Sequence, residues 1–228
     1  MESIKNGPNP ETPSTSSAYW KIIEKTGTVL IAVSLFILIF TYYPIVKEEA
    51  KYFVTQGDNA TPVLTKEEEA RVGENAPAAL VPVDEEFGIV IPKIGANAKI
   101  IPDVNWEDSA AYQRALTRGV AQARGTSTPD KPGNLFLFAH SGVDFYEALR
   151  YNAVFYLIDK LEKGDTMDVF YQGKKYAYTV SEKKTVGAEA VEYVAGDKGK
   201  KTLTLMTCWP PGTTLKRLIV IADQVRDN

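Results

Sequence analysis

The stretch of 21 residues from Thr26 to Val46 contains no charged side chain, and it constrains this 228-residue chain more than any other feature. As a helix rising about 1.5 Å per residue, it would extend over about 30 Å, the thickness of a bilayer's hydrocarbon core. A cleaved signal peptide is the alternative, but its apolar region is typically about 7–15 residues long. This run ends instead in an aromatic boundary, Thr41-Tyr42-Tyr43-Pro44. We therefore predict an uncleaved transmembrane signal anchor over residues 26–46.

The orientation of this anchor is nearly balanced by charge. Lys21 and Lys25 precede the span, and Lys47 and Lys51 follow it at similar distances. Because long domains translocate with little regard for flanking charge, the shorter N-terminal side is expected to be cytoplasmic. The sequence thus predicts a single-pass type II protein of the plasma membrane, with the lipid bilayer as a partner and an extracytoplasmic C-terminal domain.

Charge and composition exclude several functional classes. The net charge is −3, so the chain has no overall basic field, and we expect no nucleic-acid partner. The single cysteine, Cys208, forbids an intrachain disulfide, and the single histidine, His140, makes a His/Cys metal cluster within one chain implausible. Phosphate-loop, serine-hydrolase and His-Glu-x-x-His motifs are absent from the sequence. We expect neither a metal nor a cofactor.

The rest of the chain divides by composition. Residues 1–25 form a predicted disordered cytoplasmic tail, rich in Pro and Ser over 7–17. Residues 47–84 form a predicted extracytoplasmic spacer, whose acidic run Glu67-Glu68-Glu69 is interpreted as a solvated face without a catalytic role. Residues 85–228 form the predicted folded domain.

Short apolar runs separated by turn residues fill this domain. Two helical segments are predicted, one over 107–118 and one within 145–161. The expected fold class is mainly β, a closed or nearly closed barrel or sandwich with short helices. The predicted strands cover 88–92, 98–101, 135–139, 167–171, 176–180, 202–207 and 218–222, with a hairpin turn around Gln172-Gly173-Lys174.

His140 and Cys208 both stand where an apolar strand ends. If these strands are neighbours pointing the same way, the thiol and the imidazole lie at one rim. Arg217 begins the next strand, after a loop containing Pro210-Pro211-Gly212, and an antiparallel return would bring it beside Cys208.

The three groups have complementary chemistry. A cysteine thiol of pKa about 8.5 is mostly protonated at neutral pH, and a nearby cation or imidazolium favours the nucleophilic thiolate. His140 can supply that charge or carry the leaving-group proton. Arg217 can hold a substrate carbonyl or an oxyanion, and the main-chain N–H of Trp209 is a candidate second donor. Taken singly, each residue has a plain structural explanation: an inert core cysteine, a packed histidine, a solvated arginine.

The segment Thr202-Leu203-Thr204-Leu205-Met206-Thr207-Cys208, followed by Arg217, resembles the signature of sortases, the cysteine transpeptidases of bacterial surfaces. The similarity extends through Pro132-Gly133-Asn134 to His140, Gly119-Val120-Ala121 with Gly125-Thr126, and Ile91-Pro92-Lys93-Ile94. It covers the chain from about Phe87 onward.

The resemblance implies an eight-stranded β barrel with Cys208 as nucleophile, His140 as general acid and base, and Arg217 as the clamp for substrate and oxyanion. Thr207 would line the same site. The implied partners are surface proteins with a C-terminal LPXTG-like sorting signal, and an amine acceptor from a cell-wall peptide or a pilin lysine. The implied reaction anchors surface proteins or polymerises pilins through a thioacyl-enzyme intermediate.

Two alternatives stay open at this level. A cysteine peptidase would hydrolyse the same intermediate, and a non-catalytic, membrane-tethered β domain would bind a partner with Cys208 buried. The sequence also departs from the family pattern: Ala139 stands where glycine is frequent, and the spacer lacks the Asp-Pro-aromatic lid motif of many pilin-polymerising sortases.

Overall fold

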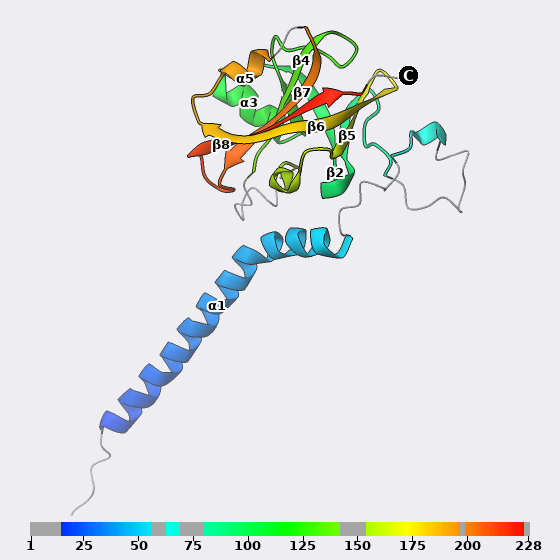
Figure 1. Ribbon diagram of the computed structural model, residues 1–228. Coiled ribbons are helices and arrows are strands. Elements are labelled where there is room, and N and C mark those ends of the chain that lie inside the picture. The colour runs from blue at the N-terminus through cyan, green and yellow to red at the C-terminus, as the bar shows by residue number, and fades with distance from the viewer. Residues whose placement is uncertain (1–14, 56–62, 69–79, 142–153, 197–198, 226–228) are drawn as a thin grey trace, which may run out of the picture. The chain divides into compact units, whose positions relative to one another are not determined.

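The computed structural model describes residues 15–55, 63–68, 80–141, 154–196 and 199–225. Contacts divide the chain into two units, Met1–Tyr43 and Pro44–Asn228. The first contains most of a long helix, and the second contains a β barrel (Figure 1).

Helix α1 spans Thr15–Thr55, and its segment Tyr19–Tyr43 is long and apolar enough to cross a membrane. The hydroxyls of Thr28, Ser34 and Thr41 each donate to the carbonyl four residues earlier, at 2.9, 2.8 and 2.7 Å. Such bonds satisfy polar side chains inside the helix, as a hydrocarbon environment requires. The helix extends beyond the predicted 26–46 at both ends, so residues 15–25 are helical where a disordered tail was predicted. Residues 1–14 lie outside the described part of the chain.

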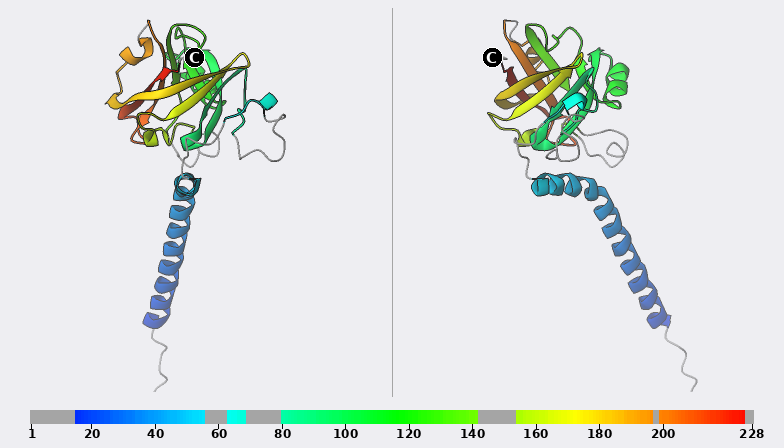
Figure 2. Two further views of the ribbon diagram at one scale, coloured as in Figure 1. Left: turned by 45° about the vertical axis from the view of Figure 1, so that its right-hand side comes forward. Right: turned by 90° about the vertical axis from the view of Figure 1, so that its right-hand side faces the viewer.

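The second unit is a closed barrel with strand order β1-β2-β3-β4-β7-β8-β6-β5 (Figures 1 and 2). The predicted eight-stranded, mainly β fold is therefore confirmed. The strands are β1 (Phe87–Ile91), β2 (Ala96–Val104), β3 (Val120–Ala123), β4 (Gly133–Phe138), β5 (Thr166–Tyr171), β6 (Lys174–Gly187), β7 (Lys201–Trp209) and β8 (Lys216–Gln224).

Each strand of the sequence analysis has a counterpart, whereas β3 was not predicted. All four residues of β3 are buried, so the strand lacks the alternation of apolar and polar residues that marks a half-buried strand. The predicted hairpin joins β5 to β6, with Tyr171 opposite Lys174. Gln172 and Gly173 have φ values of 51° and 73°, the left-handed geometry that a tight two-residue hairpin turn requires.

Short helices complete the domain. Helix α3 (Ser109–Leu116) confirms the predicted 107–118 helix, and the Asp108 carboxylate caps it by accepting from the N–H groups of Ala110 and Ala111 at 2.9 and 3.1 Å. The segment predicted within 145–161 contains η3 (Ile158–Lys160), and its residues 145–153 lie outside the described residues. Helix α5 (Glu192–Ala195), between β6 and β7, was not predicted.

Alternating side chains build two apolar layers on the sheet. Leu135 and Leu137 of β4 point into the barrel with Leu203 and Leu205 of β7. The outward-facing residues form a second cluster beneath α3, whose buried members include Phe136, Phe138, Ala115 and Leu116. The outer face of β4 is thus covered as well, which is why this strand reads as a continuous apolar run.

Part of the predicted spacer packs on the barrel. Val63 is buried against Val90 and Phe170, and it bridges to Leu80. The carboxylate of Glu68 accepts from the backbone N–H and the hydroxyl of Thr65 at 2.8 and 3.0 Å. Residues of the predicted spacer therefore contact the barrel, because the apolar Val63 side chain is buried there.

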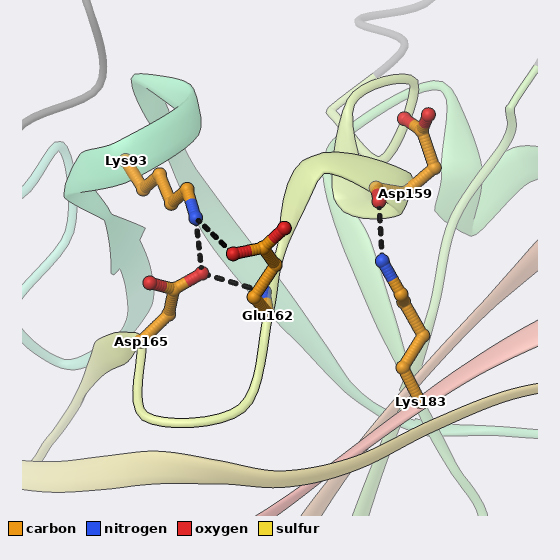
Figure 3. A network of polar contacts seen from close by, with 5 residues as sticks. All are labelled: Lys93, Asp159, Glu162, Asp165 and Lys183. Carbon is orange, nitrogen blue, oxygen red and sulfur yellow. Dashed lines mark hydrogen bonds and ion pairs between the residues drawn. The ribbon is translucent and has the colours of Figure 1, made fainter.

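A largely buried ion pair links the turn after β1 to the residue that precedes β5. Lys93 lies in η2 (Pro92–Ile94), and its Nζ contacts the Asp165 carboxylate at 2.8 Å, with the side chains 14% and 7% exposed (Figure 3). The same carboxylate accepts from the backbone N–H of Glu162 at 2.6 Å. Glu162 also lies near Lys93, at 3.9 Å, but its side chain is 78% exposed. Removing the Asp165 charge therefore leaves the Lys93 ammonium with only this distant, exposed partner.

We expect Asp165→Asn to lower the free energy of unfolding by about 3 kcal/mol, measured by urea denaturation of the full chain in detergent. The matched control is Asp103→Asn, because Asp103 forms an ion pair with Arg124 at 3.3 Å while both side chains are more than half exposed. That control should cost less than about 1 kcal/mol. Equal losses for the two variants would contradict the role of the buried pair.

Candidate functional site

Strands β4 and β7 run parallel, in register from Gly133 opposite Lys201 to Phe138 opposite Met206. Beyond the last pair, the N–H of Ala139 still donates to the carbonyl of Met206 at 3.2 Å. Continued for two residues past the end of β4 at Phe138, this register puts His140 level with Cys208. The condition set by the sequence analysis, neighbouring strands that point the same way, is met.

Strand β8 returns antiparallel to β7 and places Arg217 directly opposite Cys208. The Cβ atoms of opposed residues in such a pair lie about 4.5–5.5 Å apart, with both side chains on one face of the sheet. The predicted antiparallel return is therefore confirmed at the level of individual residues.

All three side chains belong to the outer face of the barrel. His140 follows Phe138 by two residues, and Cys208 follows Met206 by two, so each shares the outward orientation of that apolar neighbour. His140, Cys208 and Arg217 are all half-buried. The inert alternative required a buried Cys208, whereas this residue is partly exposed and its thiol is not in a disulfide.

The loop between β7 and β8 holds the Arg217 guanidinium. Its Nη1 donates to the carbonyls of Thr214 and Lys216 at 3.2 and 3.0 Å. An arginine guanidinium has more N–H donors than these two bonds use. The Arg217 side chain can therefore still donate a hydrogen bond to a substrate oxygen.

Thr207 and Trp209 flank the cysteine differently. Thr207 points into the barrel, where its hydroxyl donates to the carbonyl of Ala139 at 2.9 Å. This bond ties the residue preceding His140 to the residue preceding Cys208. Trp209 is the last residue of β7, lies opposite Lys216, and packs its side chain against the barrel core.

Tyr112 of α3 contacts the imidazole. The rings of Tyr112 and His140 meet edge to face, with centroids 6.2 Å apart and planes at 66°, while Tyr112 stacks on Phe138 at 5.6 Å. Aromatic pairs in these arrangements restrict one another's orientation. Helix α3 therefore limits where the His140 ring can lie.

A cavity of about 300 Å³ runs along the same face. Its floor is formed by Phe136, Phe138 and Met206. Arg217 also lines the cavity, whereas Cys208 and His140 are not among its lining residues. One wall comes from Trp106, Glu107, Ser109 and Tyr112; the facing wall comes from Ala188, Ala190, Val191 and Val194 of the segment containing α5. The mostly apolar lining, with Glu107, Ser109 and Arg217 as its polar members, suits an extended peptide with apolar side chains.

Sequence reasoning missed Tyr112 and the wall containing α5. Tyr112 precedes Ala115 by three residues, the spacing of one helix face, so its apolar periodicity could have pointed to it. The wall has no such signal, because a helix as short as Glu192–Ala195 contains too few residues for a periodic pattern. Among the described residues, no group of three or more His, Cys, Asp and Glu side chains is arranged to hold a metal ion.

The arrangement supports acyl transfer in particular. A thiol opposite an arginine, with an imidazole just past the end of the neighbouring strand, can together attack a carbonyl, move a proton and stabilise the resulting oxyanion. The fold and the site thus place the protein in the class of thiol-dependent acyl-transfer enzymes built on a β barrel.

Residues 89–225, more than half of the chain, match the family model described as the sortase domain. This chain belongs to the sortase family, and the resemblance predicted from the sequence is confirmed. As a sortase it is a cysteine transpeptidase. None of the curated proteins matches the chain in sequence.

Solved structures agree with this assignment. Sortase C-1 from Actinomyces oris is 26% identical, with a TM-score of 0.53 over 80% of this chain and 99% of the other. Sortase C1 from Streptococcus agalactiae is 26% identical, with a TM-score of 0.52 over 72% and 79%. A Clostridium perfringens Sortase D5 transpeptidase, 21% identical with a TM-score of 0.50 over 79% and 99%, shows the same fold.

Proposed function

We propose that Cys208 cleaves a C-terminal sorting signal of LPXTG type and transfers the protein to an amine. The observation that carries this proposal is the direct pairing of Cys208 with Arg217, a residue that also lines the neighbouring cleft. A peptide lying in this cleft would present its carbonyl to both the sulfur and the guanidinium.

The proposed reaction has two steps. In the first step, the Cys208 thiol proton passes to His140, and the thiolate forms a bond to the scissile carbonyl carbon while Arg217 and the N–H of Trp209 receive the oxyanion. The C–N bond then breaks as the His140 imidazolium gives that proton to the leaving amine. An acceptor amine then attacks the thioester, His140 takes its proton, and the Cys208 thiolate leaves. Thr207 serves the site from inside the barrel, because its bond to Ala139 fixes the chain that carries His140.

The substrates would be surface proteins with such a signal, and the acceptor would be a cell-wall peptide or a pilin lysine. The names of two similar structures refer to pili. One is the sortase C1 of a group B Streptococcus pilus island, a chain 23% identical to this one with a TM-score of 0.53, and the other is a pilus-related sortase C of group B Streptococcus. The spacer of this chain nonetheless lacks an Asp-Pro-aromatic sequence. The proposal therefore includes both surface-protein anchoring and pilin polymerisation.

Cys208→Ala should abolish both cleavage of an LPXTG-type peptide and the acyl-enzyme adduct, because no other thiol exists in the chain. Cleavage is measured by chromatography and the adduct by intact-protein mass spectrometry. Circular dichroism of the variant serves as the control for folding. Retained cleavage would refute the assignment of the nucleophile.

Arg217→Lys should lower kcat/KM by about 100-fold or more, because an ammonium cannot reproduce the planar donor fork beside the oxyanion. The matched control is Arg124→Lys, an exposed arginine outside the residues that line the cleft, which should leave kcat/KM within about twofold. A fully active Arg217→Lys enzyme would remove Arg217 from the clamp.

We further propose that α1 anchors the chain in the plasma membrane as a type II protein with the barrel outside the cell. The uncharged span supports the anchoring, and the length of the C-terminal part supports the direction. Protease added to intact spheroplasts should digest the barrel domain and spare an N-terminal epitope tag. Protection of the barrel would reverse the topology.

A further inference from the structure

The amide of Asn134 lies on the outer face of β4, two residues before Phe136 in the floor of the cleft, and it joins three segments of the chain. Asn134 is 2% exposed. Its Oδ1 accepts from the hydroxyls of Thr202 and Thr204 on β7 at 3.0 and 2.9 Å. Its Nδ2 donates to the carbonyls of Tyr193 and Val194 in α5 at 3.0 and 3.2 Å.

These bonds use both halves of the amide for different purposes. The acceptor half is bound to a strand that the barrel already holds through its ladder hydrogen bonds. The donor half is bound to α5, which has four residues and is too short to be stable by itself. The donor half therefore fixes the segment that contributes Ala188, Ala190, Val191 and Val194 to the cleft.

Gly196, directly after α5, also lies in close contact with Asn134. Gly196 follows the helix with φ of 55°, and a Cβ added there would lie 2.4 Å from the Cβ of Asn134. Only glycine permits this approach, because both the backbone angle and the space exclude a side chain. The Lys184 ammonium also lies 5.0 Å from the centre of the Tyr193 ring, so strand β6 contacts the same helix.

We propose that Asn134 is a positioning residue that sets the width of the substrate cleft by holding the α5 wall against β4. The wall contacts a bound peptide before and during the reaction, so loss of its position weakens binding of the substrate and of the transition state alike. Such a change raises KM and leaves kcat nearly unchanged. This inference rests on the proposed function for its kinetic part, whereas the positioning itself is measurable without catalysis.

Asn134→Asp tests the donor half of the amide while it keeps the acceptor half. The variant keeps the shape and the acceptor half, but it replaces the donor with an oxygen that faces two carbonyl groups. Gly196→Ala disturbs the same contact from α5 and supplies a second test where a buried carboxylate prevents folding.

The matched control is Gln122→Glu. Gln122 is also buried, 5% exposed, and its Nε2 donates to the carbonyls of Thr126 and Ser127 at 3.4 and 3.0 Å. The same chemical change therefore releases a loop between β3 and β4 whose residues do not line the described cleft.

The experiment uses the full chain in detergent and combines hydrogen exchange with steady-state cleavage of an LPXTG-type peptide. In Asn134→Asp and Gly196→Ala, we expect exchange of the amides in 190–195 to accelerate at least about tenfold while β4 and β7 stay protected. KM should rise about tenfold, kcat should stay within about twofold, and alkylation of Cys208 by iodoacetamide should keep its rate. Gln122→Glu should change exchange near 124–130 and leave KM unaltered.

Unchanged exchange over 190–195 in both variants would overturn the proposal, as would accelerated exchange with an unaltered KM. A fall in kcat together with a slower alkylation of Cys208 would overturn it too, because Asn134 would then act on the reacting end of the site. Wild-type protein that cleaves no such peptide would refute the proposed function instead, and the exchange result would still decide whether Asn134 positions α5.

Discussion

The parallel pairing of β4 with β7 is the interaction on which the site depends. Its register, from Gly133 opposite Lys201 onward, determines which residues of two distant segments lie level at the rim of the barrel. A shift by one residue would turn every side chain of one strand to the opposite face and separate His140 from Cys208. The inward leucines of both strands oppose such a shift, because it would remove them from the barrel core and turn Asn134 of β4, or Thr202 and Thr204 of β7, into that core.

The outer face of β4 illustrates how one strand can carry several roles. Every second residue faces outward, in the order Asn134, Phe136, Phe138 and His140. The first holds the α5 wall, the next two form the floor of the cleft, and the last lies at the proposed reacting end. Binding and chemistry are therefore fixed to the same rigid element, so an extended peptide can be aligned with the sulfur without a large movement of the barrel.

Much of this molecule was predictable from local patterns. The uncharged run predicts α1, alternating or continuous apolar runs predict seven of the strands, and Gln172-Gly173 predicts the hairpin. The patterns failed for β3 and α5, where the elements are too short for a period to develop, and for the docked spacer at Val63. Each of these short segments is stabilised by contacts with residues distant in the sequence rather than by interactions within the segment.

The residue types that can carry the chemistry were determined by the sequence alone, because the chain contains one cysteine and one histidine, each placed where an apolar strand ends. The tertiary structure decided their neighbours. Three contacts join residues from different strands or loops: the pairing of Cys208 with Arg217, the hydrogen bond from Thr207 to Ala139, and the hydrogen bonds from Asn134 to α5. Such contacts depend on strand order and register, which result from burial of the whole core and are not encoded in any single segment.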